Sequence, residues 1–342
     1  MKIMNKKVII IAEAGVNHNG DINLAKEMID VAKTAGVDYV KFQTFTAKDL
    51  ANKDAKKADY QLTNNNDTSQ YKMLKNLEIS FQDHLTLIDY CKQRKIKFFS
   101  TAFDNNGLDF LNSLNFKFFK IPSGEITNYP YLKKLSIIGK PVILSTGMSN
   151  KEEIKQALNI LTSNNLKIHD ITILHCNTDY PTAYDDVNLK AMLDIKKTFN
   201  VKIGYSDHTL GIEVPIASVA LGACVIEKHF TLDRKMKGPD HSASLEPNEL
   251  RDMVQGIRNI EKAISGNGCK NPTKSEIKNK GVSRKSIFLK KDVKKGELFS
   301  EDLIKTLRPG NGLSPMLIPN LLNKKFKKNL KKNNKLKLSD FE

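Results

Sequence analysis

The sequence predicts an α/β fold, a (β/α)₈ barrel followed by a small C-terminal domain. Eight short apolar runs alternate with segments of helical periodicity, which is the order of elements in such a barrel. Residues able to do chemistry stand where these runs end, and the C-terminal ends of the strands build the active site of this fold. The runs lie at residues 8–18, 39–45, 98–103, 118–125, 141–147, 171–180, 201–208 and 225–230.

Helical periodicity is clearest at residues 23–35, 151–163, 187–199 and 247–264, and the last of these is expected to close the barrel. Asn150 precedes one of these helices and Glu153 stands three residues on, which is the pattern of a capping box. The preceding Ser-Thr-Gly turn is therefore expected near a helix N-terminus, where backbone N–H groups favour an anion such as phosphate.

Three segments fall outside the strand–helix repeat. Residues 46–79 form a long polar insert, and a loop of this length is either functional or mobile; we favour a lid. Residues 266–283 contain Gly, Pro and Ser with little periodicity and are expected to be a linker. Residues 284–342 show short strand patterns and tight turns. The predicted domains are therefore a barrel at 1–265 and a small domain at 284–342.

Composition limits the class of protein. A chain of 342 residues, 40% of them hydrophobic, has room for one barrel and a small domain. No run approaches the roughly 18 apolar residues of a membrane span, and the apolar start, interrupted at Glu13, is too short for a signal peptide. We therefore expect no membrane partner. The four cysteines form no C-x-x-C pair, so we expect a reducing, cytoplasmic setting.

The net charge of +17 would attract polyanions, and residues 283–342 supply sixteen Lys and Arg against six Asp and Glu. In the lysine-rich stretch 324–337 the one aromatic residue is Phe326, whereas single-strand binders interleave aromatic and basic groups. A solvated basic face explains this segment better than a nucleic-acid site, so no nucleic-acid partner is expected.

Two histidines are candidates for metal binding. His208 and His229 end consecutive strands, and neighbouring strands lie about 4.8 Å apart, so both imidazoles could reach one ion. Two neutral imidazoles with oxygen ligands suit Mn²⁺, Zn²⁺ or Fe²⁺ and leave positions for substrate. Two ordinary strand-end histidines are the alternative. Asp207, beside His208, should face the other way in a regular strand.

Lys41 with Gln43, and Glu227 with His229, are two residues apart and so share one face of a strand. They are expected to contact substrate, or, for Lys41 and Glu227, to form a buried ion pair. Lys120 ends a strand shortly before Pro-Ser-Gly-Glu and could hold a phosphate or carboxylate as a point charge. The alternative is a Schiff base with a carbonyl substrate. Several lysines and serines around one cavity indicate an anionic ligand.

Motifs at the strand ends and beyond them are IAEAGVNHNGD, KFQTF, KIPSGE, ILSTGM, LHCNTDYPT, GYSDHTLG, EKHFTLD, GPDHSAS and RPGNGLSP. They resemble those of a known family, the bacterial sialic acid (N-acetylneuraminate) synthases, within the wider group of nonulosonic acid synthases. The resemblance runs from about residue 8 to the C-terminus. It implies a TIM barrel followed by an antifreeze-like (SAF) domain, and a homodimer in which the small domain reaches over the partner's barrel.

This resemblance implies that phosphoenolpyruvate condenses with an open-chain N-acetylated hexosamine, N-acetylmannosamine for sialic acid, while water is consumed and phosphate released. A divalent metal, Mn²⁺ first with Mg²⁺ or Co²⁺ possible, would be held by His208 and His229 and would polarise the aldehyde. Glu13 would handle a proton or a sugar hydroxyl. The resemblance places Lys41, Thr101, Lys120, Ser123, Ser145 and Ser206 around phosphoenolpyruvate, Gln43, Tyr180 and Asp240 near the sugar, Glu125 in the same site, and Arg308 at the N-acetyl group.

Two departures from the family pattern bear on this site. Ala102 replaces a proline, and a small backbone effect is expected because Thr101 remains. The stretch NTDYPTA differs from the TNIYPTP or NTEYPTP of relatives, which leaves open whether Asn177 or Thr178 contacts phosphoenolpyruvate. The nearest alternative function is a legionaminic acid synthase that uses 2,4-diacetamido-2,4,6-trideoxymannose. A Schiff-base aldolase acting through Lys120 is a more distant one.

Overall fold

The computed structural model describes residues 7–58, 61 and 68–342. The chain divides into two compact units, Met1–Ser265 and Gly266–Glu342. Part of the insert expected to be a lid, residues 59–60 and 62–67, lies outside the described residues. None of the helices in the described part of the chain combines the length and apolar character needed to cross a membrane.

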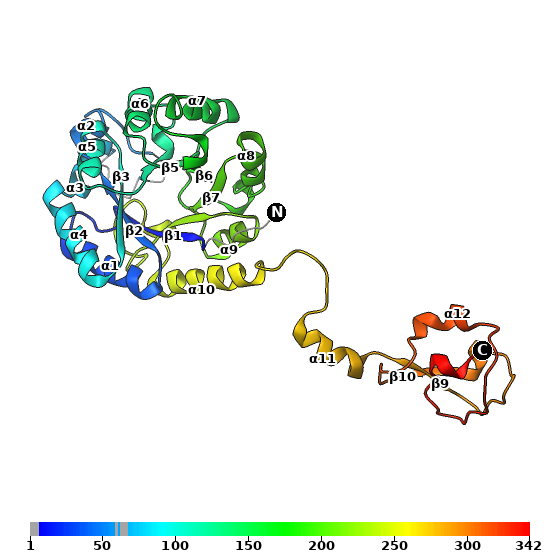
Figure 1. Ribbon diagram of the computed structural model, residues 1–342. Helices are drawn as coiled ribbons and strands as arrows, with labels where there is room; N and C mark the ends of the chain where they lie inside the picture. Colours follow the sequence, from blue (N-terminus) through cyan, green and yellow to red (C-terminus); the bar gives the residue numbers. More distant parts are fainter. Residues whose placement is uncertain (1–6, 59–60, 62–67) are drawn as a thin grey trace. The chain divides into compact units, whose positions relative to one another are not determined.

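Eight parallel strands form a nearly closed barrel in the first unit (Figure 1). Their order is β3-β2-β1-β8-β7-β6-β5-β4, and the two end strands, β3 and β4, are also in contact. The predicted (β/α)₈ barrel is therefore confirmed. The strands are β1 (Ile9–Gly15), β2 (Tyr39–Thr44), β3 (Lys97–Ala102), β4 (Phe119–Ile121), β5 (Val142–Ser145), β6 (Ile171–His175), β7 (Lys202–Asp207) and β8 (Val225–His229).

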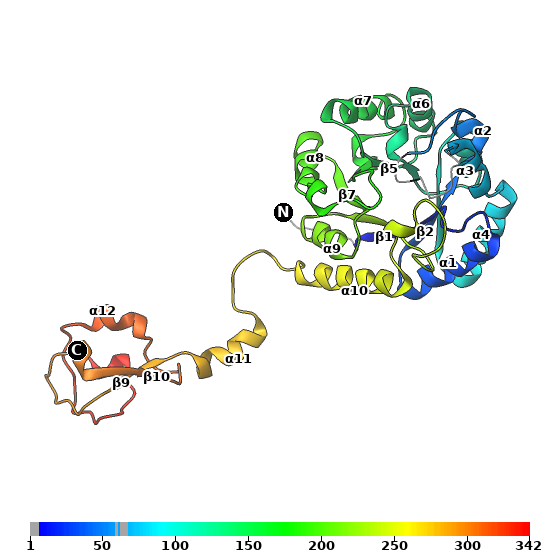
Figure 2. The ribbon, with the colours of Figure 1, turned by 180° about the vertical axis from the view of Figure 1, so that it is seen from behind.

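Helices surround the barrel (Figure 2), and most of them bury an apolar face against its strands. Several begin at a polar side chain that accepts a first-turn N–H, among them Ser80, Asp104 and Asn150. The helices of this unit are α1 (Ile22–Ala35), α2 (Ala47–Leu50), α3 (Gln70–Leu77), α4 (Phe81–Arg94), α5 (Asn105–Ser113), α6 (Tyr129–Ile138), α7 (Lys151–Leu161), α8 (Ala191–Phe199), α9 (Glu213–Ala220) and α10 (Pro247–Ala263).

The inside of the barrel is filled by layers of side chains. One apolar layer consists of Ile11, Phe99, Ile143, Leu174 and Val225, all buried. Because side chains alternate along a strand, the residues two positions further on share the same inner face. These next residues are Glu13, Thr101, Ser145, Cys176 and Glu227. The barrel interior thus changes from apolar to polar toward the C-terminal ends of its strands.

The second unit has its own apolar core, which includes Ile287, Leu289, Phe299 and Phe326. It contains α11 (Lys274–Ser283), the antiparallel strands β9 (Ser286–Leu289) and β10 (Ile304–Leu307), and α12 (Ile318–Leu321). The helix α11 was not expected from the sequence, which shows little periodicity there. A capping box of Thr273 and Glu276 begins this helix, and none of its side chains is buried, so no apolar stripe marks it in the sequence.

Candidate active site

A cavity of about 520 Å³ opens at the C-terminal ends of the barrel strands, where the sequence predicts the site. Side chains from most of the strands reach it. Its polar lining is Glu13, Lys41, Gln43, Gln61, Gln70, Lys120, Ser123, Ser145, Thr178, Tyr180, Ser206, His208, Glu227, His229 and Asp240. Its apolar lining includes Val16, Leu50, Met73, Leu74, Leu77 and Phe103.

Four charged side chains form a buried cluster on the cavity floor. Nζ of Lys41 lies 3.0 Å from Oε2 of Glu13 and 3.4 Å from Oε1 of Glu227, and Nζ of Lys120 lies 3.0 Å from the same Glu227 oxygen. The strand register creates this arrangement, because Glu13 on β1 stands directly opposite Lys41 on β2. The buried ion pair expected as one interpretation of Lys41 and Glu227 is present, and both residues also line the cavity.

The surroundings give the two carboxyl groups of this cluster very different pKa values. Burial raises the pKa of Glu13 to about 7, although Lys41 opposes the shift. Burial alone would raise the pKa of Glu227 too, but Lys120 and Lys41 outweigh it and hold that pKa at about 2. Burial lowers the pKa of Lys120. Glu227 is thus a fixed anion, whereas Glu13 can exchange a proton near neutral pH.

His208 and His229 face each other across the cavity, with ring centroids 5.5 Å apart and Tyr180 packed 4.1 Å from the ring of His208. Burial lowers the pKa of His208 to about 4 and that of His229 well below its usual value, so both imidazoles are neutral at pH 7. Nδ1 of His208 donates to the carbonyl oxygen of Asn177. The proton of the neutral ring is therefore on Nδ1, and Nε2 carries the lone pair that can bind a ligand.

The histidine pair fits a divalent metal with open positions for substrate. Nδ1 of His229 is buried and has no hydrogen-bond partner among the described residues, and Oδ2 of Asp240 lies 3.8 Å from it. Burial raises the pKa of Asp240 to about 6. Within the described ranges no group of three or more His, Cys, Asp or Glu is arranged to hold a metal ion. A metal here would therefore complete its shell with water or substrate oxygens.

The side of the cavity formed by β4, β5 and β6 is lined with hydroxyls. The Gly147 N–H donates to Oγ of Ser123 over 3.0 Å, and Oγ of Ser145 is buried without a hydrogen-bond partner in the described chain. A Cβ at Gly147 would lie 2.5 Å from Thr178 and 2.9 Å from Ser123 Oγ, so glycine permits this close packing. The capping box predicted at α7 is confirmed. Because the Asn150 side chain accepts N–H groups at the start of this helix, those groups are not left to bind an anion such as phosphate, as the sequence had suggested.

Three residues of the barrel that were expected in the site do not line the cavity. Thr101 lies beneath it and accepts a 2.9 Å hydrogen bond from Lys41. The Asn177 side chain accepts the N–H of Asp179 and turns into its own loop, so that Thr178 faces the cavity instead. Glu125 turns away at a short 3₁₀ helix, Ser123–Glu125, and accepts a hydrogen bond from Asn128. Arg308 belongs to the second unit, just after β10.

An apolar wall made by the insert between β2 and α4 was missed by the sequence analysis. We define this apolar wall as Leu50 of α2, Met73, Leu74 and Leu77 of α3, and the neighbouring Val16 and Phe103, all of which line the cavity and pack together. The spacing of Met73, Leu74 and Leu77 is that of one helix face, a signal concealed by the polar residues around it.

Comparisons with known proteins agree with this architecture. The model of the NeuB family matches residues 28–270, and the model of the SAF domain matches residues 284–342. The N,N'-diacetyllegionaminic acid synthase of Campylobacter jejuni is 55% identical over 327 residues, which cover 95% of this chain and 98% of that protein. The enzyme of the same name from Legionella pneumophila is 47% identical and covers 94% of this chain and 91% of its own.

A solved structure is similar as well. The N-acetylneuraminic acid (sialic acid) synthetase from Leptospira borgpetersenii is 36% identical, with a TM-score of 0.70 over 80% of this chain and 90% of that chain. A family model that covers most of the barrel, together with relatives of this identity over nearly the whole length, establishes the relationship. The chain belongs to the NeuB family of enzymes and carries a SAF domain at its C-terminal end.

Proposed function

We propose that this enzyme condenses phosphoenolpyruvate with open-chain 2,4-diacetamido-2,4,6-trideoxymannose and water, giving N,N'-diacetyllegionaminic acid and phosphate. The observation that carries the reaction type is the buried cluster of Lys41, Lys120, Glu13 and Glu227 beside two neutral histidines. The two ammonium groups can bind an anionic substrate, and the carboxyl group of Glu13 can accept or donate a proton.

Phosphoenolpyruvate would occupy the part of the cavity with the lysines and hydroxyls. Lys41 and Lys120 bind its negative charges, and the hydroxyls of Ser123, Ser145 and Ser206 donate to its carboxylate and phosphate oxygens. The unpartnered Oγ of Ser145 supports this arrangement, because a buried hydroxyl costs free energy unless it finds a hydrogen-bond partner. Thr178, rather than Asn177, faces this ligand.

The π electrons of phosphoenolpyruvate form a bond from its methylene carbon to the aldehyde carbon of the sugar, and the aldehyde C=O π bond breaks to leave an alkoxide. Water then adds to the neighbouring carbon of phosphoenolpyruvate, and the bond from that carbon to the phosphate oxygen breaks, so that a carbonyl group forms and phosphate leaves with the second proton of the water. Glu13 takes up the first proton released by the water, since its pKa of about 7 makes it an effective base near neutral pH, and passes it to the alkoxide, which becomes a hydroxyl. Gln43 and Asp240 orient the sugar hydroxyls.

His208 and His229 would hold a divalent cation, for which we propose Mn²⁺, with Mg²⁺ or Co²⁺ as alternatives. When bound, such an ion supplies Lewis-acid activation of a carbonyl group. The proposal also includes a homodimer. In it, Arg308 of one subunit's SAF domain contacts the N-acetyl group of the sugar bound in the partner's barrel.

Two observations favour the diacetamido sugar over N-acetylmannosamine. The apolar wall offers burial to the methyl group at carbon 6 and to the methyl groups of the acetamides, whereas N-acetylmannosamine presents hydroxyls at carbons 4 and 6. The relatives at 55% and 47% identity both carry the name of the diacetyllegionaminic acid synthase.

The proposal keeps the expected division of the chain into a barrel at 1–265, a linker at 266–283 and a small domain at 284–342.

N-acetylneuraminate synthesis is the second candidate, because the Leptospira borgpetersenii structure of that name shares the fold at 36% identity. Phosphate release from phosphoenolpyruvate in the presence of Mn²⁺ tests both. The two sugars are compared at equal concentration, with a chelator control and mass detection of the nonulosonic acid. Higher kcat/KM for the diacetamido sugar supports our proposal, higher kcat/KM for N-acetylmannosamine supports the second candidate, and activity with neither contradicts both.

A further inference from the structure

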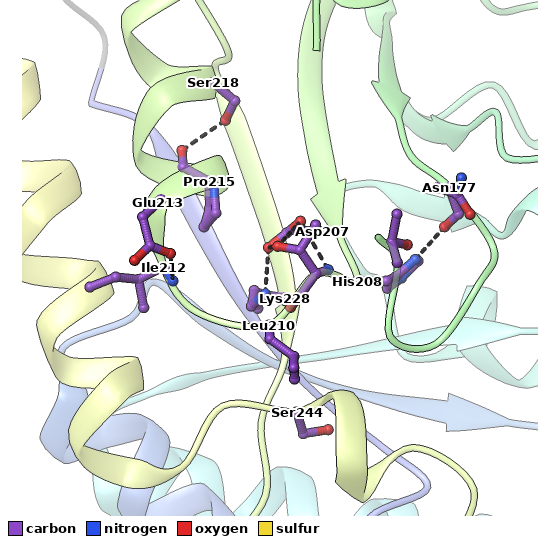
Figure 3. Close-up of polar contacts among 12 residues, drawn as sticks. Asn177, Asp207, His208, Leu210, Ile212, Glu213, Pro215, Ser218, Lys228 and Ser244 are labelled. Atoms are coloured by element: carbon purple, nitrogen blue, oxygen red, sulfur yellow. Dashed lines mark hydrogen bonds and ion pairs between the residues drawn. The ribbon is translucent and has the colours of Figure 1, made fainter. Parts of the chain in front are cut away.

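A buried ion pair lies on the opposite side of the strands from the cavity. Asp207 on β7 and Lys228 on β8 stand directly opposite each other in the parallel register. Figure 3 shows their side chains pointing toward each other, and Nζ of Lys228 donates to Oδ2 of Asp207. Both side chains are fully buried, at 0% exposure. This pair confirms the expectation that the side chain of Asp207 faces the opposite way from that of His208.

The polar groups of the pair are satisfied within a closed network. Nζ of Lys228 also donates to the carbonyl oxygen of Thr209 over 2.5 Å. The backbone N–H and the hydroxyl of Thr209 donate to Oδ1 of Asp207 over 3.2 and 3.0 Å. The chain from Asp207 to Thr209 is thereby tied to β8. His208 lies in the middle of this segment, and its carbonyl oxygen accepts the N–H of Thr182 over 2.9 Å.

Stability does not explain why charges occupy this place. The neighbouring outward residues Ile203, Tyr205 and Ile226 are buried and largely apolar, so a hydrophobic pair would suit the layer. Replacing a buried ion pair by packed apolar side chains is often neutral or stabilising, because the desolvation of two charges is so costly. Such pairs are best attested as devices that fix one geometry among several.

The sequence positions of the pair indicate which geometry it fixes. Asp207 immediately precedes His208, and Lys228 immediately precedes His229. We infer that Asp207 and Lys228 are positioning residues that hold β7 and β8 in the register at which the two imidazoles converge on one ligand. This inference rests on the proposed function, in which the two histidines hold a metal ion.

The inference predicts a loss of metal affinity without a matching loss of fold. In the Asp207→Asn/Lys228→Met variant both charges are removed together, so neither is left buried and unpaired. The full-length protein, free of substrate, is titrated with Mn²⁺, and unbound Mn²⁺ is measured by electron paramagnetic resonance. We expect Mn²⁺ to bind at least 10-fold more weakly than in the wild type, within the range seen when residues behind metal ligands are changed. The urea unfolding midpoint in chelator should stay close to that of the wild type.

A second buried polar cluster provides a matched control. The hydroxyls of Thr44 and Ser100 lie 2.7 Å apart, and Thr44 also contacts Nε2 of His84 over 2.8 Å. These residues link β2, β3 and α4 on the outside of the barrel, as the ion pair links β7 and β8. Ser100→Ala should lower the unfolding midpoint while leaving Mn²⁺ affinity within 2-fold of the wild type.

Three outcomes would contradict the inference. Wild-type affinity in the folded double variant would show that the pair does not position the histidines, while leaving the metal site itself intact. If Ser100→Ala lost as much Mn²⁺ affinity as the double variant, the loss would be explained by general destabilisation of the fold and not by the ion pair. Failure of the wild type to bind Mn²⁺ would overturn the proposed metal site and this inference with it. If this double variant does not fold, Asp207→Leu/Lys228→Met, which also removes both charges and leaves no buried amide, is judged by the same criteria.

Discussion

Nζ of Lys120 lies 3.0 Å from Oε1 of Glu227, and Nζ of Lys41 approaches the same oxygen to 3.4 Å. Two lysines therefore share a single carboxylate oxygen, while the other oxygen of Glu227 is buried without a hydrogen-bond partner among the described residues. Because Glu13 is only partly ionised near neutral pH, the cluster carries excess positive charge. This excess is what an incoming anion would neutralise.

Lys120→Met should raise the KM for phosphoenolpyruvate by about 10- to 100-fold, since a hydrogen bond to a charged group contributes about 1.5–3 kcal/mol. Steady-state kinetics with saturating sugar measure the change. Lys151→Met is the matched control, because Lys151 forms an exposed ion pair with Asp194 outside the cavity. An unchanged KM in Lys120→Met would contradict the proposed role. Borohydride trapping of pyruvate on Lys120 would instead favour the Schiff-base alternative.

Glu13→Gln should lower kcat by about 100-fold, the usual contribution of a positioned base. The pH profile gives the sharper test. The pKa of Glu13 is about 7, so its carboxylate, the form that accepts a proton, is present above this pH and lost below it. The wild-type rate should therefore rise with pH through about 7, and the variant should lack this step. A variant that keeps the step would place the titrating group elsewhere.

His229→Ala should abolish metal-dependent phosphate release and the stabilisation that accompanies metal binding. A ligand that binds the folded state at 100 times its Kd stabilises it by about 2.7 kcal/mol. Thermal unfolding of the wild type should therefore shift upward on addition of Mn²⁺ and return after chelation, whereas the variant should show no shift. His169→Ala is the control, because this exposed histidine precedes β6 and lies outside the cavity. Full activity in chelator-treated wild type would refute the metal.

Met73→Gln should weaken selection of the diacetamido sugar by about 10-fold, because a polar group in the apolar wall penalises methyl groups more than hydroxyls. The quantity measured is the ratio of kcat/KM for the two sugars. Ile137→Gln, on an exposed face of α6, serves as the control. The KM for phosphoenolpyruvate should stay unchanged, and a parallel loss for both sugars would mean that the wall does not discriminate between them.

Local patterns were sufficient to predict the strands and the position of the cavity at their C-terminal ends. Each strand is a short apolar run, and the alternation of side chains explains why Glu13, Lys41 and Glu227 all point inward. The alternation fails where the chain leaves a regular strand. Glu125 illustrates this, because the 3₁₀ helix Ser123–Glu125 turns its carboxylate toward Asn128.

Contacts between distant segments could not be predicted from the sequence. The pairing of Asp207 with Lys228 depends on the register of β7 against β8, which no local pattern specifies. The apolar wall was concealed because α3 presents its apolar residues within a polar insert. The helix α11 buries no side chain, so the periodicity that reveals other helices is missing there.

The apolar wall comes chiefly from one insert between β2 and α4, whereas the lysines and hydroxyls come from the barrel strands and the turns that follow them. The two halves of the cavity are thus encoded by separate stretches of the gene. Under the proposed function, substitutions or length changes in the insert should alter the sugar that is accepted while the residues that bind phosphoenolpyruvate stay unchanged. Such an enzyme could acquire a new sugar substrate without any change in the chemistry of bond formation.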